Sequence, residues 1–266
     1  MTDLLSKSEY QKVARELTFP AFAVIDGKLC GAASGATFAT INPVMGERFA
    51  DIPACSQEDV DAAVASARTA FDDGRWSKLH PARRPQAGHS QTGRPGRTER
   101  AGTFRDGKRL DAGKTLFDCQ TVDVPETVNV LRWHAEAIDK IYDQVSSASD
   151  GHIAMIVREP VDVVGLVLPW NIGPSLAASC SLVVKSAEDT SLTTMRVAQL
   201  ALEVGIPPGV FNVVTGTGPA VGEPIGRHRD IDMVSFTGST DTGRRFLSYS
   251  VESKEIVLEM GGKSRA

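Results

Sequence analysis

The chain has 266 residues, 41% of them hydrophobic, which is enough to bury a sizeable core in one large or two modest domains. Its formal net charge of −4 at pH 7 gives no basic surface for long-range attraction to phosphate backbones, so a nucleic-acid partner is not expected. The four cysteines show neither C-x-x-C pairing nor metal-ligand spacing with the five histidines, which predicts no metal centre and fits a reducing cytoplasm.

The first twenty residues mix acidic and basic side chains with apolar ones, and therefore lack the apolar core of an export signal. Residues 163–184 form an uncharged stretch long enough to cross a membrane, but Pro169, Asn171 and Pro174 interrupt it and β-branched residues flank it. We interpret this stretch as a buried strand followed by a connection. A cytoplasmic protein with no membrane span is therefore predicted.

Two turn signals near the start of the chain predict surface hairpins at residues 23–28 and 41–50. Asp26-Gly27 and Met45-Gly46 each lie between strand-like residues. Ser56 follows, with a carboxylate three positions later and then an apolar repeat at helical spacing. This pattern predicts an amphipathic helix.

Residues 80–109 contain no Val, Ile, Leu or Met, whereas arginines accumulate there among Gly, Thr and Pro. Such a segment cannot bury enough apolar surface to offset its ordering entropy, so a disordered basic segment is predicted. A basic arm that binds RNA or acidic lipid is the alternative, although Phe104 is the only aromatic residue interleaved with the charges.

Downstream, Pro125 suits the first turn of a helix whose apolar positions recur at helical spacing, and residues 151–160 predict an arm of paired strands. From residue 161 onward, strands alternate with helices. The strands are predicted at 163–168, 182–185, 210–214, 233–236 and 256–258, and the helices at 191–203 and 242–250. This alternation predicts an α/β fold with a Rossmann-like parallel sheet covered by helices.

Two stretches of this sheet carry the chemistry. An apolar run from Met233 ends at Gly238 and opens into a helix, so the backbone N–H groups of the turn can hold a phosphate. The neighbouring β-branched run brings one carboxylate, Glu259, against two glycines. A phosphate turn and a strand-end carboxylate suggest a nucleotide-dependent enzyme, although a glycine after a strand is also ordinary turn chemistry.

Five motifs stand together in one order along the chain. They are Leu-Pro-Trp-Asn at 168–171, Val-Lys-Ser-Ala-Glu at 184–188, Gly-Val-Phe-Asn-Val-Val-Thr-Gly at 209–216, Phe-Thr-Gly-Ser-Thr-Asp-Thr-Gly at 236–243 and Leu-Glu-Met-Gly-Gly-Lys at 258–263. In these motifs the chain resembles the aldehyde dehydrogenase superfamily, from about residue 41 onward. Within that superfamily it looks most like the bacterial enzymes that act on γ-aminobutyraldehyde and γ-glutamyl-γ-aminobutyraldehyde.

The resemblance implies an NAD-dependent oxidation of an aldehyde to a carboxylic acid, with two catalytic residues in this chain. Asn171 would help to form the oxyanion hole, and Glu259 would be the general base. The cofactor-binding residues implied are Trp170, Lys185, Glu188, Gly216, Gly238, Ser239 and Gly243. Lys185 and Glu188 would contact the adenosine ribose, where a carboxylate disfavours the 2′-phosphate of NADP, so NAD is the expected cofactor. Gly238, Ser239 and Gly243 would receive the pyrophosphate of the cofactor.

The resemblance also implies a domain plan. Residues 1–150 would be the N-terminal part of the cofactor-binding domain, residues 151–160 an oligomerisation arm, and residues 161–266 the NAD-binding core, with the catalytic domain missing. The chain departs from the family at Ser186, where proline is usual, at Arg265, and after Asn171, where about nine residues, roughly two and a half helical turns, are lacking. The abrupt break between Arg84 and Leu110 indicates a compensated frameshift.

The family's nucleophilic cysteine lies beyond the Glu-x-Gly-Gly-Lys motif, and none of Cys30, Cys55, Cys119 and Cys180 matches it. A truncated chain without aldehyde-oxidising activity is therefore predicted. A non-enzymatic NAD-binding fragment, or one that pairs with other subunits through its arm, is the alternative. Exposed apolar surface is expected where the catalytic domain would pack.

Overall fold

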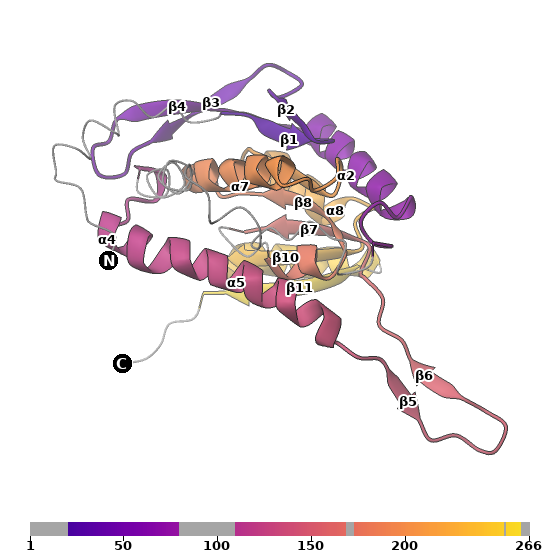
Figure 1. Ribbon diagram of the computed structural model, residues 1–266. Helices are drawn as coiled ribbons and strands as arrows, with labels where there is room; N and C mark the ends of the chain where they lie inside the picture. Colours follow the sequence, from indigo (N-terminus) through magenta and orange to yellow (C-terminus); the bar gives the residue numbers. More distant parts are fainter. Residues whose placement is uncertain (1–20, 80–109, 169–172, 253, 262–266) are drawn as a thin grey trace.

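The structure is a computed structural model that describes residues 21–79, 110–168, 173–252 and 254–261. A seven-stranded sheet forms its centre, with the strand order β11-β10-β7-β8-β9-β1-β2 (Figure 1). Five strands are parallel: β7 Val163–Val167, β8 Ser181–Lys185, β9 Phe211–Val214, β10 Met233–Gly238 and β11 Glu255–Met260. The predicted parallel α/β sheet is thereby confirmed.

Valine and leucine fill the central strands because both faces of the sheet are covered. Every residue of β7, β8 and β9 is buried. Strands buried on both faces are continuous apolar runs rather than alternating ones. This explains why residues 163–184 carry no charge before Lys185, and no helix among the described residues is long and apolar enough to cross a membrane.

The first hairpin corrects a prediction. Strand β1, Ala23–Ile25, turns at Asp26 and Gly27 into β2, Lys28–Cys30, as the turn signal indicates. The hairpin is not a surface element, because Ala23 and Val24 are fully buried and β1 extends the central sheet by pairing antiparallel with β9. The second hairpin, β3 Thr37–Ile41 with β4 Arg48–Pro53, forms a separate two-stranded sheet.

Helices cover both faces of the sheet and enclose one apolar cluster on each face. On one face lie α2 Gln57–Asp72, α8 Glu223–Arg227 and α9 Thr240–Tyr249, whose buried residues form one cluster with the sheet. The second cluster contains residues of α6 Gly173–Ala177 and α7 Ser191–Glu203. Helix α2 begins with the predicted capping box, in which the Ser56 N–H donates to the Asp59 carboxylate at 2.9 Å.

Helix α5, Val124–Ala137, has a proline in its first turn, as predicted, and follows the short helix α4, Leu116–Asp118. Short helical turns also occur in the described residues: η2 Cys119–Asp123, η3 Ile138–Lys140, η4 Glu188–Thr190, η5 Gly218–Gly222 and η6 Ser250–Glu252. The basic segment 80–109, the first twenty residues, and Trp170 and Asn171 lie outside the described residues.

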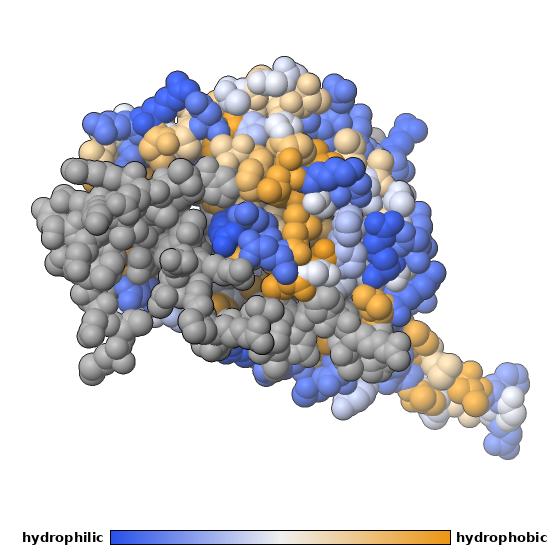
Figure 2. Space-filling view, turned by 45° about the horizontal axis from the view of Figure 1, so that its top comes forward, coloured by the Kyte–Doolittle hydropathy of each residue, from blue (hydrophilic) through white to orange (hydrophobic). Residues whose placement is uncertain are grey.

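A hairpin arm projects from the body after α5 and returns to β7. Its strands are β5 Gln144–Ser146 and β6 Ala154–Ile156, so the paired strands begin before the predicted range of 151–160. All residues of both strands are exposed. Figure 2 shows hydrophobic residues along this arm at the lower right. Met155 and Ile156 of β6 are both exposed.

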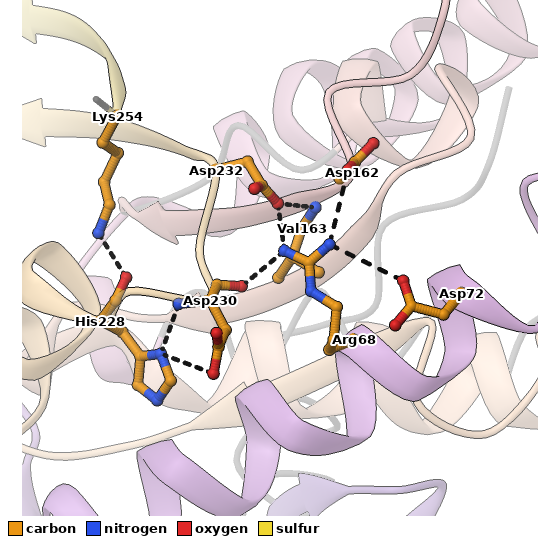
Figure 3. Close-up of polar contacts among 8 residues, drawn as sticks. All are labelled: Arg68, Asp72, Asp162, Val163, His228, Asp230, Asp232 and Lys254. Atoms are coloured by element: carbon orange, nitrogen blue, oxygen red, sulfur yellow. Dashed lines mark hydrogen bonds and ion pairs between the residues drawn. The ribbon is translucent and has the colours of Figure 1, made fainter. Parts of the chain in front are cut away.

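A charged cluster ties α2 to the amino ends of β7 and β10 (Figure 3). The Arg68 guanidinium forms an ion pair with Asp232, lies 3.5 Å from Asp162 and donates to the carbonyl oxygen of Asp230 at 2.9 Å. The Asp232 carboxylate also accepts from the Val163 N–H at 2.9 Å. These contacts hold the amino ends of the strands in place. The candidate site lies at the opposite, carboxyl edge of the sheet.

Candidate dinucleotide site

The carboxyl ends of β7, β8 and β10 open into a cleft of about 280 Å³. From β7 the chain proceeds to β8 and β9 on one side, and β10 and β11 then lie on the other side of β7. In open α/β sheets, ligands bind in the crevice at such a topological switch point. The strand order therefore places the cleft where a nucleotide site is expected.

One wall of the cleft carries a fixed ion pair. Lys185, the last residue of β8, is only 4% exposed, and its Nζ lies 3.0 Å from a carboxylate oxygen of Glu188. The other Glu188 oxygen accepts a hydrogen bond from the Gly218 N–H at 2.8 Å. Burial raises the pKa of Glu188, but hydrogen bonds from backbone N–H groups and from Lys185 outweigh it and hold that pKa below its ordinary value. The carboxylate is therefore ionised and directed at the cleft, ready to accept from hydroxyl groups.

The opposite wall is the face of α9 that carries Thr242, Arg245 and Tyr249. Ser239 is the N-cap of this helix, and its Oγ accepts from the Thr242 N–H at 3.3 Å. The first N–H groups of an α-helix have no intrahelical partner, and the helix dipole makes this end attractive to anions. Gly238 and Ser239, both exposed, thus stand where β10 passes into the N-terminus of α9.

Two glycines permit close packing around the cleft rather than lining it. A Cβ on Gly243 would lie 2.4 Å from the Met260 sulfur, so a larger residue would displace the flexible Met260 side chain of β11. Gly216 has a φ of +147°, and a Cβ there would lie 3.0 Å from the Cys55 carbonyl oxygen. Gly216 is buried under the turn that follows β9, whereas Gly218 reaches the cleft itself.

Glu259 lies at the same edge of the sheet but one strand further out. It pairs in register with Thr237, which lines the cleft, and its own side chain is exposed on the edge strand β11. The structure therefore brings Lys185 and Glu188 together with the start of α9, and leaves Glu259 next to the cleft rather than in it.

Comparison with known proteins decides the family. Residues 31–266 match the aldehyde dehydrogenase family. The chain belongs to the aldehyde dehydrogenase family. It is similar to the aminoacetaldehyde dehydrogenase of Pseudomonas aeruginosa, with 53% identity over 100% of this chain and 55% of that protein. The chain spans about half the length of the curated relatives it matches.

Solved structures of the family share the same fold. The P. syringae indole-3-acetaldehyde dehydrogenase, in complex with NAD+, superposes with a TM-score of 0.89 at 39% identity, over 98% of this chain and 55% of that one. The γ-glutamyl-γ-aminobutyraldehyde dehydrogenase of Burkholderia cenocepacia superposes with a TM-score of 0.88 at 40% identity, over 98% of this chain and 54% of that one. The predicted family is thereby confirmed.

None of the cysteine thiols in the described part of the chain lines the cleft. Cys55, Cys119 and Cys180 are buried and Cys30 is half-buried. Burial raises the pKa of Cys180 to about 11, so its thiol stays protonated at neutral pH. Within the described residues, no group of His, Cys, Asp or Glu is arranged to hold a metal ion.

Among the cleft-lining residues that sequence reasoning missed are Pro219 and Glu223, from the segment after β9, and Arg245, from α9. Arg245 was detectable in principle, because it lies three residues after Thr242 and four before Tyr249 and so shares their helical face.

Proposed function

We propose that this chain is the NAD-binding part of an NAD-dependent aldehyde dehydrogenase, which oxidises an aldehyde to a carboxylic acid. The observation that carries the proposal is the ionised Glu188, held by Lys185 and Gly218 in a cleft opposite the N-terminus of α9. The NAD+ complex of the similar P. syringae enzyme supports NAD as the ligand.

In this proposal the cleft recognises the adenosine half of the cofactor. The ribose hydroxyls donate to Glu188, whose position disfavours a 2′-phosphate and so selects NAD over NADP. Lys185 keeps the carboxylate in place. The pyrophosphate lies at the turn formed by Gly238 and Ser239, with Gly243 in the first turn of α9 beside it.

We assign the chemical step to two residues. Asn171 would stabilise the oxyanion that forms when a nucleophile adds to the aldehyde carbonyl, and Glu259 would act as general base. Trp170 is assigned to the cofactor site. NAD, when bound, accepts the hydride. Because none of the chain's described thiols faces the cleft, we propose that the 266-residue chain binds NAD but does not oxidise aldehydes by itself.

Aldehydes that carry an amine or amide nitrogen are the proposed substrate class of the whole enzyme. The relative that is 53% identical is named for aminoacetaldehyde, and the Burkholderia structure is named for γ-glutamyl-γ-aminobutyraldehyde. We place the protein in the cytoplasm, which the four unpaired cysteines fit.

Calorimetric titration of the chain with NAD and with NADP tests the cofactor proposal. NAD is expected to bind more tightly than NADP, and Glu188→Gln is expected to weaken NAD binding about tenfold, because a hydrogen bond to a charged group is lost. Glu136→Gln, at an exposed carboxylate of α5 away from the cleft, is the matched control. The assignment would be overturned if the wild-type chain did not bind NAD, or if Glu188→Gln bound NAD as tightly as the wild type.

Absorbance at the NADH band tests the chemical part. We expect no NADH from the chain with aminoacetaldehyde, γ-aminobutyraldehyde or acetaldehyde. Steady NADH production that Cys180→Ser abolishes would identify a nucleophile in this chain and refute the proposal.

A second function, association with other subunits, is favoured by the arm. Ile153 is 81% exposed and Met155 63% exposed on a hairpin that projects from the body. Exposed apolar clusters of this kind mark interaction surfaces. Sedimentation velocity is expected to show an oligomer that Met155→Asp dissociates and that Ser147→Asp, on the same arm, leaves intact. A monomeric wild-type chain would contradict this.

A further inference from the structure

The cleft has the shape of a slot. One side is built from Gly218, Pro219 and Gly222, which present backbone and a proline ring rather than long side chains. A Cβ added to Gly218 would meet nothing within 4 Å, so the space in front of this wall is open. The other side is α9, with Arg245 between Thr242 and Tyr249 on its cleft-facing side. A slot between a flat backbone wall and a helix suits a planar ring.

Arg245 differs from the other cations near the slot. Lys185 is paired with Glu188, Arg227 is paired with Glu223 at 2.9 Å, and the neighbouring Arg244 is paired with Asp241 at 3.6 Å. Arg245 has no ion pair with any residue in the part of the chain that the structure describes, although its side chain lines the slot.

A guanidinium is planar and weakly hydrated, and it stacks on aromatic faces. The same helix region already shows this geometry, because the Arg227 guanidinium lies 4.6 Å from the centre of the Tyr249 ring. Arginine planes stack on nucleic-acid bases in the same way, and the attraction does not depend on the ring's hydrogen-bonding edge.

We propose that Arg245 stacks on the purine ring of the bound nucleotide and closes the slot over it, as a binding residue for the base. The inference rests on the proposed NAD site. It assigns to Arg245 a contact with the base, and not with the pyrophosphate or with a 2′-phosphate. The purine is then held between the wall formed by Gly218 and Pro219 and the guanidinium plane.

Calorimetric titrations with AMP, ADP-ribose, NAD, NADP and nicotinamide mononucleotide test the contact. Arg245→Ala is expected to weaken the binding of AMP, ADP-ribose, NAD and NADP by one common factor of about five- to thirtyfold, and to leave the mononucleotide, which has no purine, unchanged. Arg245→Lys keeps the charge but not the plane, and is expected to bind AMP more weakly than the wild type. Arg244→Ala, on the adjacent residue outside the slot, is the control and should bind all five ligands normally.

Any other set of affinity changes in Arg245→Ala would overturn the inference. A loss confined to NADP would assign Arg245 to the 2′-phosphate, and an equal loss for the nicotinamide mononucleotide would assign it to phosphate in general. Adenine-nucleotide binding that Arg245→Ala does not change would overturn the stacking contact alone. No binding of any adenine nucleotide by the wild-type chain would overturn the proposed function together with it.

Discussion

Replacement of Gly209 by alanine should destabilise the fold strongly, because this residue lies where the turn before β9 meets α2. Its φ is +81°, and an added Cβ would lie 2.6 Å from the Ser66 carbonyl oxygen and 2.9 Å from the Ala70 Cβ. The turn cannot move away easily, since the buried Asn212 side-chain amide donates to the Gly209 carbonyl at 2.7 Å. The clash is with backbone, which has no alternative rotamer.

The magnitude follows from three contributions. The left-handed backbone costs an L-residue about 1–2 kcal/mol, of which about 0.4–1 kcal/mol is offset by the lower entropy of the unfolded alanine variant. Forcing a methyl group into an already filled contact costs a further 1–3 kcal/mol or so. We therefore expect Gly209→Ala to lower the free energy of unfolding by about 2–4 kcal/mol.

Gly35→Ala is the matched control. Gly35 has a φ of +72°, but nothing lies within 4 Å of the Cβ position, so only the backbone contribution remains and the expected loss is about 1 kcal/mol or less. Urea unfolding with an unchanged m-value measures both losses. Equal destabilisation by the two substitutions would refute the claim that the approach of α2 to the turn is what requires glycine.

Three further substitutions test the charged cluster and the thiols. Asp162→Asn should raise the free energy of unfolding at pH 7 and lose that gain as the pH falls towards about 4, because burial and the neighbouring Asp232 raise the pKa of Asp162 despite Arg68. Asparagine tolerates the φ of +56° at this position, and a gain in urea stability that persisted at pH 3 would contradict the titration argument. Arg68→Met should lower the free energy of unfolding by about 1–3 kcal/mol at low salt, and by less in 1 M NaCl; a loss independent of salt would point to packing instead. Thiol titration with a disulfide reagent at pH 8 should label Cys30 before Cys180, whose pKa of about 11 suppresses the reactive thiolate, and a fast phase removed by Cys180→Ser would refute this.

The sequence predicts the local elements of this chain well because their signals are local. Helix α7, predicted at 191–203, is found at Ser191–Glu203, because Gly205 and Pro207 end the helix within a few residues. The order of the strands is a different matter. Nothing near Ala23 indicates that its hairpin joins the sheet beside β9, since that pairing depends on residues far along the chain.

The candidate site, too, was only partly predictable from the sequence. Lys185 and Glu188 were predicted through the family resemblance, yet their ion pair and the hydrogen bond from Gly218 appear only when η5 folds against β8. Arg245 was overlooked because a charged residue on an exposed helical turn is ordinarily solvated. Glu259 could be placed on a strand end, but its exposure at the sheet edge follows from the strand order alone.

The pairing of β1 with β9 has a consequence for how this chain is made. The hydrogen bond from the Asp26 N–H to the Asn212 side chain joins residues 186 positions apart. At a synthesis rate of about 5–20 residues per second, the ribosome needs about 10–40 s to reach the second partner. Until β7 and β8 are synthesised, the apolar face of α2, with Val60 and Val64, lacks the strands that cover it. The nascent chain thus presents a bare amphipathic helix to the cell's chaperones until its late strands emerge.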